Sequence, residues 1–150
     1  LYLFWACGEV TDEQVKKFCN AFSELVVQAV IDSPWVPGVL DYLANNHQTK
    51  YFVIVTATPQ DEIDKILTAL EIDDFFGEVF GAPAEKKDVI KSVLEEQKIT
   101  PNQALMIGDT ETDLLAAQTN LVPFLVRKTS LNLHLQRLYS GPQFTDLSCE

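Results

Sequence analysis

The chain has 150 residues, of which 47% are hydrophobic and 22% are charged, and its formal net charge is −11. The length predicts one domain with an apolar core, and the acidic balance argues against a nucleic-acid surface. No apolar run reaches membrane-spanning length, and no basic segment precedes an apolar one, so we expect no membrane span and no signal peptide. The three cysteines are irregularly spaced, which predicts reduced thiols in a cytoplasmic protein.

The first third of the chain predicts helices. Thr11 and Gln14 form a capping-box pattern, and apolar residues then recur at helical spacing as far as Ile31. Pro37-Gly38 predicts a turn, and a short helix follows it up to Asn45-Asn46. The apolar residues 1–5 precede this region, and their pattern fits neither element type clearly.

The rest of the chain predicts alternating strands and helices, which indicates a parallel sheet covered by helices on both faces. The apolar run 51–55 is typical of a strand buried on both faces. The predicted elements, in chain order, are strand 51–55, a helix capped by Thr58 with Pro59 at its first position, strand 78–80, a helix through 89–94, strand 104–107, helix 112–118 and strand 121–126.

Polar residues follow three of these strands. Thr56 ends one strand, the loop Gly81–Lys86 follows another, and Asp109 ends a third, with Asp113 four residues later. Ligands of parallel sheets collect at the carboxyl ends of the strands, so we expect these residues to lie along one edge. Two neighbouring carboxylates keep their charge beside a cation, and Mg²⁺ suits one or two carboxylates and phosphate oxygens.

Each of these residues also has a purely structural interpretation. The two aspartates fit a solvated loop with a helix N-cap, and the Thr56 hydroxyl could satisfy only nearby backbone groups. Lys86 lies at a predicted helix N-terminus, where the helix dipole disfavours a cation. It is therefore either held by an anion, such as a carboxylate or a phosphate, or it is a solvated surface lysine.

The combination resembles the haloacid dehalogenase (HAD) superfamily of phosphatases. Residues 52–56 are similar to its second motif, residues 81–86 to a form of its third, and residues 106–113 match its fourth, Gly-Asp-x-x-x-Asp. The resemblance implies a three-layer, Rossmann-like α/β core and Mg²⁺-dependent hydrolysis of a small phosphorylated metabolite. The residues it implies are Asp109 for the metal, Thr56, Ala57 and Lys86 for the phosphate, and Lys86 and Asp113 for catalysis.

The resemblance also implies a domain division. Residues 34–38 look like the junction at which a helical cap returns to the core. Residues 1–33 would then be a remnant of that cap, and residues 34–150 the HAD-like core.

The family's first motif, Asp-x-Asp-Gly-Thr, supplies the nucleophile, and no such run occurs here; Trp5 and Cys7 would stand in for the two acids. We therefore expect the chain to begin inside the cap, as a gene fragment, an incomplete sequence or a cleaved protein would, and to be inactive alone. The alternative is a non-catalytic relative that binds phosphate or Mg²⁺ for regulation. A receiver-like signalling domain is disfavoured, because Asp12-Glu13 follows no convincing strand.

The missing strand is central in the family, between the strands that end at Thr56 and Asp109. Its loss would leave two rows of unpaired backbone groups. We expect this slot to be filled by residues 1–5, by direct pairing of the flanking strands, or by a segment of another copy in a homodimer. Substrate identity is out of reach, because the cap that selects it is mostly missing.

Overall fold

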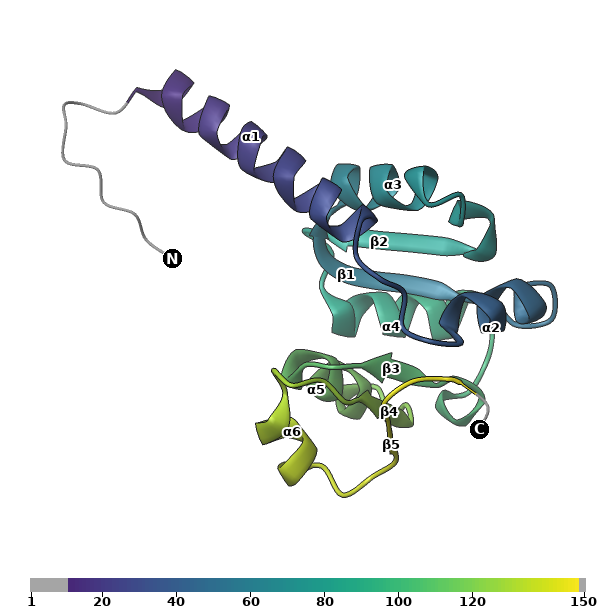
Figure 1. Ribbon diagram of the computed structural model, residues 1–150. Helices are drawn as coiled ribbons and strands as arrows, with labels where there is room; N and C mark the ends of the chain where they lie inside the picture. The colour runs from purple at the N-terminus through teal and green to yellow at the C-terminus, as the bar shows by residue number, and fades with distance from the viewer. Residues whose placement is uncertain (1–10, 149–150) are drawn as a thin grey trace.

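The computed structural model describes residues 11–148 and shows an α/β fold with parallel strands (Figure 1). The helices are α1 (Asp12–Ile31), α2 (Val39–Asn46), α3 (Gln60–Ala69), α4 (Lys86–Glu96), α5 (Glu111–Thr119) and α6 (Leu133–Leu138). The strands are β1 (Val53–Pro59), β2 (Glu78–Ala82), β3 (Met106–Gly108), β4 (Phe124–Arg127) and β5 (Gln143–Phe144). The predicted fold class and element order are confirmed, and α6 and β5 are additions that the sequence did not predict.

The strands form two sheets, although the alternating pattern predicts one. β1 pairs with β2, and β4 lies between β3 and β5, with every pair parallel. Figure 1 shows β1 and β3 as the strands that face each other between the two sheets. Within residues 11–148 neither strand has a partner on that side, so direct pairing of the two does not fill the slot. Residues 1–5 lie outside the described residues, and the homodimer stays a prediction.

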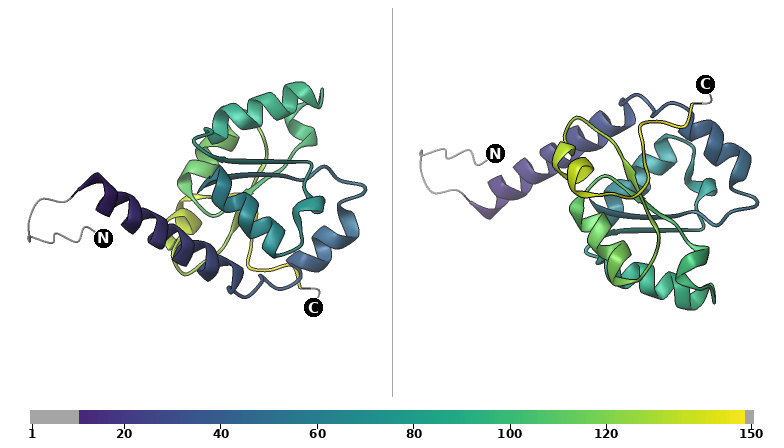
Figure 2. Two further views of the ribbon diagram at one scale, coloured as in Figure 1. Left: turned by 90° about the horizontal axis from the view of Figure 1, so that it is seen from above. Right: turned by 90° about the horizontal axis from the view of Figure 1, so that it is seen from below.

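Helices cover both faces of the β1–β2 sheet, as predicted for the parallel sheet (Figure 2). α3 packs on β1 and β2 from one side, and α4 contacts β1 from the other. α5 packs on β3 and β4 and also contacts α4, so the α4–α5 contact joins the two halves of the molecule. The views in Figure 2 show this layered body, with α1 extending beyond it.

Burial is uneven between the two halves. The side chains of Ala117, Phe124, Val126 and Leu135 form a closed cluster around β4. None of the residues of β1 is buried, and Ile107 on β3 is 50% exposed. The prediction that the run 51–55 is buried on both faces is therefore wrong, because the side of β1 that faces β3 is open in the described structure.

The beginning of α3 also differs from the prediction. Thr58 is not its N-cap, because β1 continues through Thr58 to Pro59 with a shift of register after Val55. α3 begins at Gln60, and Pro59 occupies the N-cap position without a side-chain cap. The Thr58 N–H donates to Thr56 Oγ1 at 3.1 Å instead.

The N-terminal helix has the predicted capping box. The Gln14 N–H donates to Thr11 Oγ1 at 3.3 Å, and the Thr11 N–H donates to Gln14 Oε1 at 3.0 Å. α1 contacts α3, but none of its residues is buried, and Phe18 and Phe22 are exposed. No helix within residues 11–148 is both long enough and apolar enough to cross a bilayer. The division between residues 1–33 and 34–150 stays a prediction.

The junction after α1 depends on a glycine. Gly38 has a φ of +77°, which glycine adopts without steric cost. A Cβ at this position would lie 2.3 Å from the Leu147 carbonyl oxygen. The Leu147 N–H donates to the Pro37 carbonyl at 2.9 Å, so the end of the described chain packs on the turn that leads into α2.

Candidate functional site

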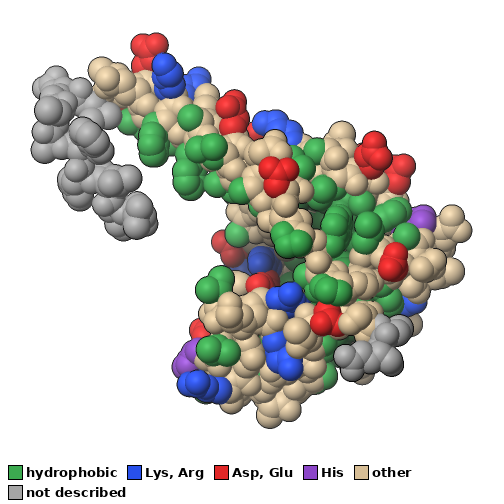
Figure 3. All heavy atoms as spheres, viewed as in Figure 1, with side chains coloured by type: hydrophobic (Ala, Val, Ile, Leu, Met, Phe, Trp, Pro, Cys, Tyr) green, Lys and Arg blue, Asp and Glu red, His purple; other side chains and the backbone are tan. Residues whose placement is uncertain are grey.

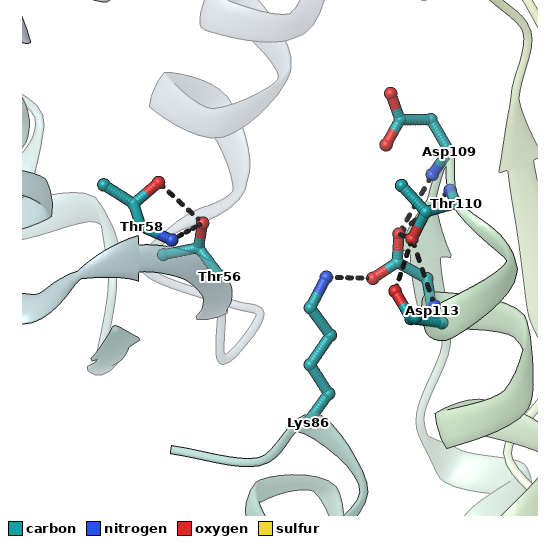
Figure 4. Close-up of polar contacts among 7 residues, drawn as sticks. Thr56, Thr58, Lys86, Asp109, Thr110 and Asp113 are labelled. Carbon is teal, nitrogen blue, oxygen red and sulfur yellow. Dashed lines mark hydrogen bonds and ion pairs between the residues drawn. The ribbon is translucent and has the colours of Figure 1, made fainter. Parts of the chain in front are cut away.

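The predicted site residues lie around the carboxyl ends of β1 and β3. Figure 4 shows Thr56 on β1, Lys86 at the start of α4, and Asp109 and Asp113 around the start of α5. Parallel strands place their carboxyl ends on the same side of a sheet, which accounts for this convergence. The space-filling view in Figure 3 shows a hollow between the two halves of the molecule, with basic and acidic side chains inside it.

Asp113 is the buried anchor of the site, with 4% of its surface exposed. Lys86 Nζ forms an ion pair and hydrogen bond with Asp113 Oδ1. Asp113 Oδ2 accepts from Thr110 Oγ1 at 2.6 Å, from the Thr110 N–H at 3.1 Å and from the Asp109 N–H at 3.3 Å. Because both carboxylate oxygens have donors, Asp113 serves to hold Lys86 and the loop after β3 in place.

Two residues that sequence reasoning did not single out make this burial possible. Thr110 is the N-cap of α5 and forms a capping box with Asp113, a signal that the Thr-x-x-Asp spacing does contain. Gly108 ends β3 directly beside Asp113, and a Cβ on Gly108 would lie 2.5 Å from the Asp113 Cβ. Glycine is therefore the residue that lets Asp113 pack against the end of the strand.

The environment of Asp113 lowers the pKa of its carboxyl group. Burial is the largest influence and by itself raises the pKa, because it disfavours the charged form. The hydrogen bonds from Lys86 and Thr110 and the charge of Lys86 together outweigh burial. Asp113 is therefore ionised at neutral pH, which is the state that holds the lysine.

Lys86 is the first residue of α4 and carries the anion that its position requires. The helix dipole disfavours a cation at this end, and Asp113 supplies the compensating negative charge. Of the interpretations that the sequence left open for Lys86, the structure has the one with a carboxylate partner. The lysine side chain is 20% exposed, and its Nζ lies between the Thr56 side of the site and Asp113 (Figure 4).

Thr56 lies on the opposite side of the opening from the two aspartates (Figure 4), and Ala57 follows it in β1. The Thr56 hydroxyl donates to Thr58 Oγ1 at 3.0 Å, and no described hydrogen bond joins it to Lys86. The expectation of a helix start directly after Thr56 is wrong, because α3 begins only at Gln60. The structure thus joins Lys86 to Asp113, and Asp113 to the Asp109 backbone, while no described hydrogen bond joins Thr56 to any of them.

Asp109 is the open carboxylate of the site. Its side chain is exposed and makes no hydrogen bond or ion pair within the described residues (Figure 4). No group of three or more His, Cys, Asp or Glu within residues 11–148 could hold a metal ion. Mg²⁺ takes one or two protein carboxylates and keeps several waters, so Asp109 fits it as one ligand of an incomplete set.

The family comparison places the chain among known proteins. The family model for haloacid dehalogenase-like hydrolases matches residues 3–126. Phosphoglycolate phosphatase of Aliivibrio fischeri is 34% identical over 88 residues, which are 55% of this chain and 39% of that protein. The Pasteurella multocida phosphoglycolate phosphatase is 29% identical over 128 residues, which are 78% of this chain and 57% of that protein.

Solved structures agree with the fold. A predicted phosphoglycolate phosphatase from Haemophilus somnus has a TM-score of 0.76 at 23% identity, over 92% of this chain and 65% of that one. CbbY from Rhodobacter sphaeroides, in complex with phosphate, has a TM-score of 0.71 at 16% identity, over 95% of this chain and 68% of that one. The chain spans 38% to 57% of the length of the curated relatives compared. Because the family model covers most of its residues, the chain belongs to the haloacid dehalogenase-like hydrolases.

Proposed function

We propose that this chain carries the phosphate- and metal-binding part of a magnesium-dependent HAD phosphatase, which in its complete form acts on a small phosphomonoester. The observation that carries the proposal is the ion pair of Lys86 with the buried Asp113, beside the open carboxylate of Asp109. The relatives support it, because several are named phosphoglycolate phosphatases and one neighbouring structure contains phosphate.

Each residue has a role in this proposal. Asp109 ligates Mg²⁺, and Lys86 binds the phosphate and offsets its charge during catalysis. Thr56 and Ala57 bind the phosphate from the β1 side of the hollow. Asp113 takes part in catalysis through Lys86, which it holds and orients. When bound, the metal ion supplies positive charge beside the transferring group, which is the dominant need in phosphoryl transfer.

The nucleophile is the part that these 150 residues do not supply. They contain no Asp-x-Asp-Gly-Thr run, and the oxygens of Asp113 are already occupied by donors. We propose that this chain alone hydrolyses little or no phosphomonoester. The absence of that run equally favours the alternative, a non-catalytic relative that binds phosphate or metal for regulation. An in-frame Asp-x-Asp-Gly-Thr in the upstream DNA would decide for the enzyme.

Turnover is the direct test of inactivity. The purified chain is incubated with Mg²⁺ and either para-nitrophenyl phosphate or phosphoglycolate, and released phosphate is measured. We expect no release above the buffer blank. Hydrolysis that disappears in Asp109→Asn would overturn the claim of inactivity while supporting the role of Asp109.

Cation binding tests the site itself. Titration with Mn²⁺, followed by electron paramagnetic resonance, should give at least about tenfold weaker binding in Asp109→Asn, because the open carboxylate is lost. Glu111→Gln is the matched control, since Glu111 is a nearby exposed acid that faces His134 at 3.8 Å instead of the hollow. Equal affinity of Asp109→Asn and the unaltered chain would remove Asp109 from the proposal.

A further inference from the structure

The side-chain amide of Asn132 uses all of its hydrogen-bonding capacity. Its Nδ2 donates to the carbonyl oxygens of Asp109 and Arg127, both at 2.8 Å. Its Oδ1 accepts from the Thr129 N–H at 2.8 Å and from Gln136 Nε2 at 2.6 Å. An amide offers two N–H donors and two acceptor positions, so every one is engaged. This one side chain thus connects the end of β4, the start of α6 and the loop after β3.

We propose that Asn132 is a positioning residue for the carboxylate of Asp109. The Asp109 N–H donates to Asp113 Oδ2 at 3.3 Å, and the Asp109 carbonyl accepts from Asn132. The peptide groups on both sides of the Asp109 Cα are therefore held. Because these two peptide planes fix φ and ψ, they also fix the direction in which the side chain leaves the backbone. The inference rests on the proposed metal-binding role of Asp109.

The support behind Asn132 is itself rigid. Gln136 also donates to the Thr129 carbonyl at 2.7 Å, which closes the turn between β4 and α6. At the other end of α6, Gln143 Nε2 donates to the carbonyls of Gln136 and Tyr139 at 3.0 and 2.8 Å. The loop that carries Asp109 is thus tied to β4, α6 and β5, and partners held in this way set the geometry of metal ligands in proteins.

A simpler role for Asn132 is to close the turn before α6 and nothing more. The bonds of Oδ1 and the bond to Arg127 would satisfy that role, whereas the bond to the Asp109 carbonyl, 23 residues earlier in the chain, is not needed for it. The two roles therefore differ in what should change at residues 109 and 110 when the amide is removed.

The test is Asn132→Ala with two matched controls. Asn120→Ala removes another amide that joins two elements, since Asn120 Nδ2 donates to the Lys87 carbonyl at 2.9 Å. Gln136→Ala loosens the turn before α6 without touching Asp109. The melting temperature of each variant is measured by circular dichroism. All variants are then compared at the same temperature interval below their own melting temperature.

The first measurement is amide hydrogen exchange by NMR without metal. Asn132→Ala should speed exchange of the Asp109 and Thr110 amides by about tenfold or more, because their loop loses its tie to α6. The two controls should leave these two amides within about threefold of the unaltered chain. Equal rates in Asn132→Ala and Asn120→Ala, or an equal effect of Gln136→Ala, would overturn the proposal.

The second measurement is Mn²⁺ affinity, which Asn132→Ala should weaken by about tenfold, as changes to residues behind a metal ligand do. Unchanged affinity, with Asp109→Asn still impaired, would overturn the positioning role. If Asp109→Asn binds as well as the unaltered chain, the proposed function fails, and amide exchange alone decides the role of Asn132.

A second substitution covers the case in which Asn132→Ala does not fold. Asn132→Asp keeps an acceptor for Thr129 and Gln136 and loses both donors, so the turn before α6 remains while the bond to Asp109 is lost. Exchange should rise at residues 109 and 110 and stay unchanged in α6, with Asn120→Asp as its control. No rise at those two amides would contradict the proposal.

Discussion

The two halves of the molecule, one around β3, β4 and β5 and the other around β1 and β2, differ in how completely their strands are buried. Around β4, Val126 and Ala117 are fully buried, and Phe124 and Leu135 complete the cluster. The half built on β1 and β2 buries residues of α3, but no residue of its own strand β1. The acidic residues of the site belong to the closed half, and Thr56 belongs to the open half. A site divided in this way has one side with fixed geometry and one side that depends on how the halves meet.

Lys86 lies where the two halves join. It begins α4, which contacts β1, and its ammonium group binds Asp113 of α5, which packs on β3. The contact between α4 and α5 continues this junction along the helices. The ion pair of Lys86 and Asp113 therefore connects the half around β4 with the half built on β1 and β2, in addition to any chemical role.

Removing one aromatic ring from each half should give the largest difference in the free energy of unfolding between the two halves. Phe124 is 5% exposed and packs edge-to-face on Tyr139, with ring centroids 5.6 Å apart. Phe124→Ala should lower the free energy of unfolding by about 3–5 kcal/mol. Phe80→Ala on β2, where the ring is half-buried, should cost about half as much, because less apolar area returns to water. Urea unfolding measures both, and equal losses would show that the halves are equally closed.

Breaking the ion pair should have the next largest effect. Lys86→Met leaves the buried Asp113 without its cation and should cost about 3 kcal/mol, the lower end for a broken buried pair, because Lys86 is 20% exposed. Lys87→Met, at the exposed neighbour, should change stability by less than about 0.5 kcal/mol. If both variants unfold at the same urea concentration, the pair does not hold the halves together.

Acid should reduce the contribution of the Lys86–Asp113 ion pair to the free energy of unfolding. The loss should be smaller than in Lys86→Met, because protonated Asp113 keeps part of its hydrogen bonding. Its pKa is lowered in the folded state, so its contribution is complete above the ordinary aspartate value of about 3.9. That contribution is lost as the pH falls through the lowered pKa. Urea unfolding between pH 6 and pH 2 should show the stability gap between the unaltered chain and Asp113→Asn narrowing. A constant gap would contradict the lowered pKa.

Local spacing made part of the site predictable. Gly-Asp-x-x-x-Asp after an apolar run places Asp113 in the first turn of a helix, because the strand must end and the helix must be capped nearby. The helix dipole disfavours a cation at a helix N-terminus, which made an anionic partner one of two interpretations of Lys86, beside a solvated surface lysine. Both features depend on a few neighbouring residues, and the structure has them where the pattern predicts.

The features that the sequence did not predict depend on distant residues. The bond from Asn132 to Asp109 spans 23 positions and follows no motif. Strand β5 is two residues long and depends on β4 for its pairing. The open side of β1 was missed because apolar residues predict burial without showing whether a neighbour is present. The apolar run ends at Val55, whereas β1 continues to Pro59, so the sequence places the start of the next helix too early and predicts Thr58 as its cap.

Within residues 11–148, β1 and β3 each have an edge without a strand partner, and this affects the distance between them as well as their pairing. Adjacent strands lie about 4.8 Å apart, so one inserted strand would hold β1 and β3 about 9.6 Å from each other. The same strand would act as a spacer between the Thr56 hydroxyl and the Asp109 carboxylate, which end those two strands. The inserted strand would then complete the sheet and set the distance between Thr56 and Asp109 at the same time. A shortened or shifted strand would disturb both the pairing and that distance.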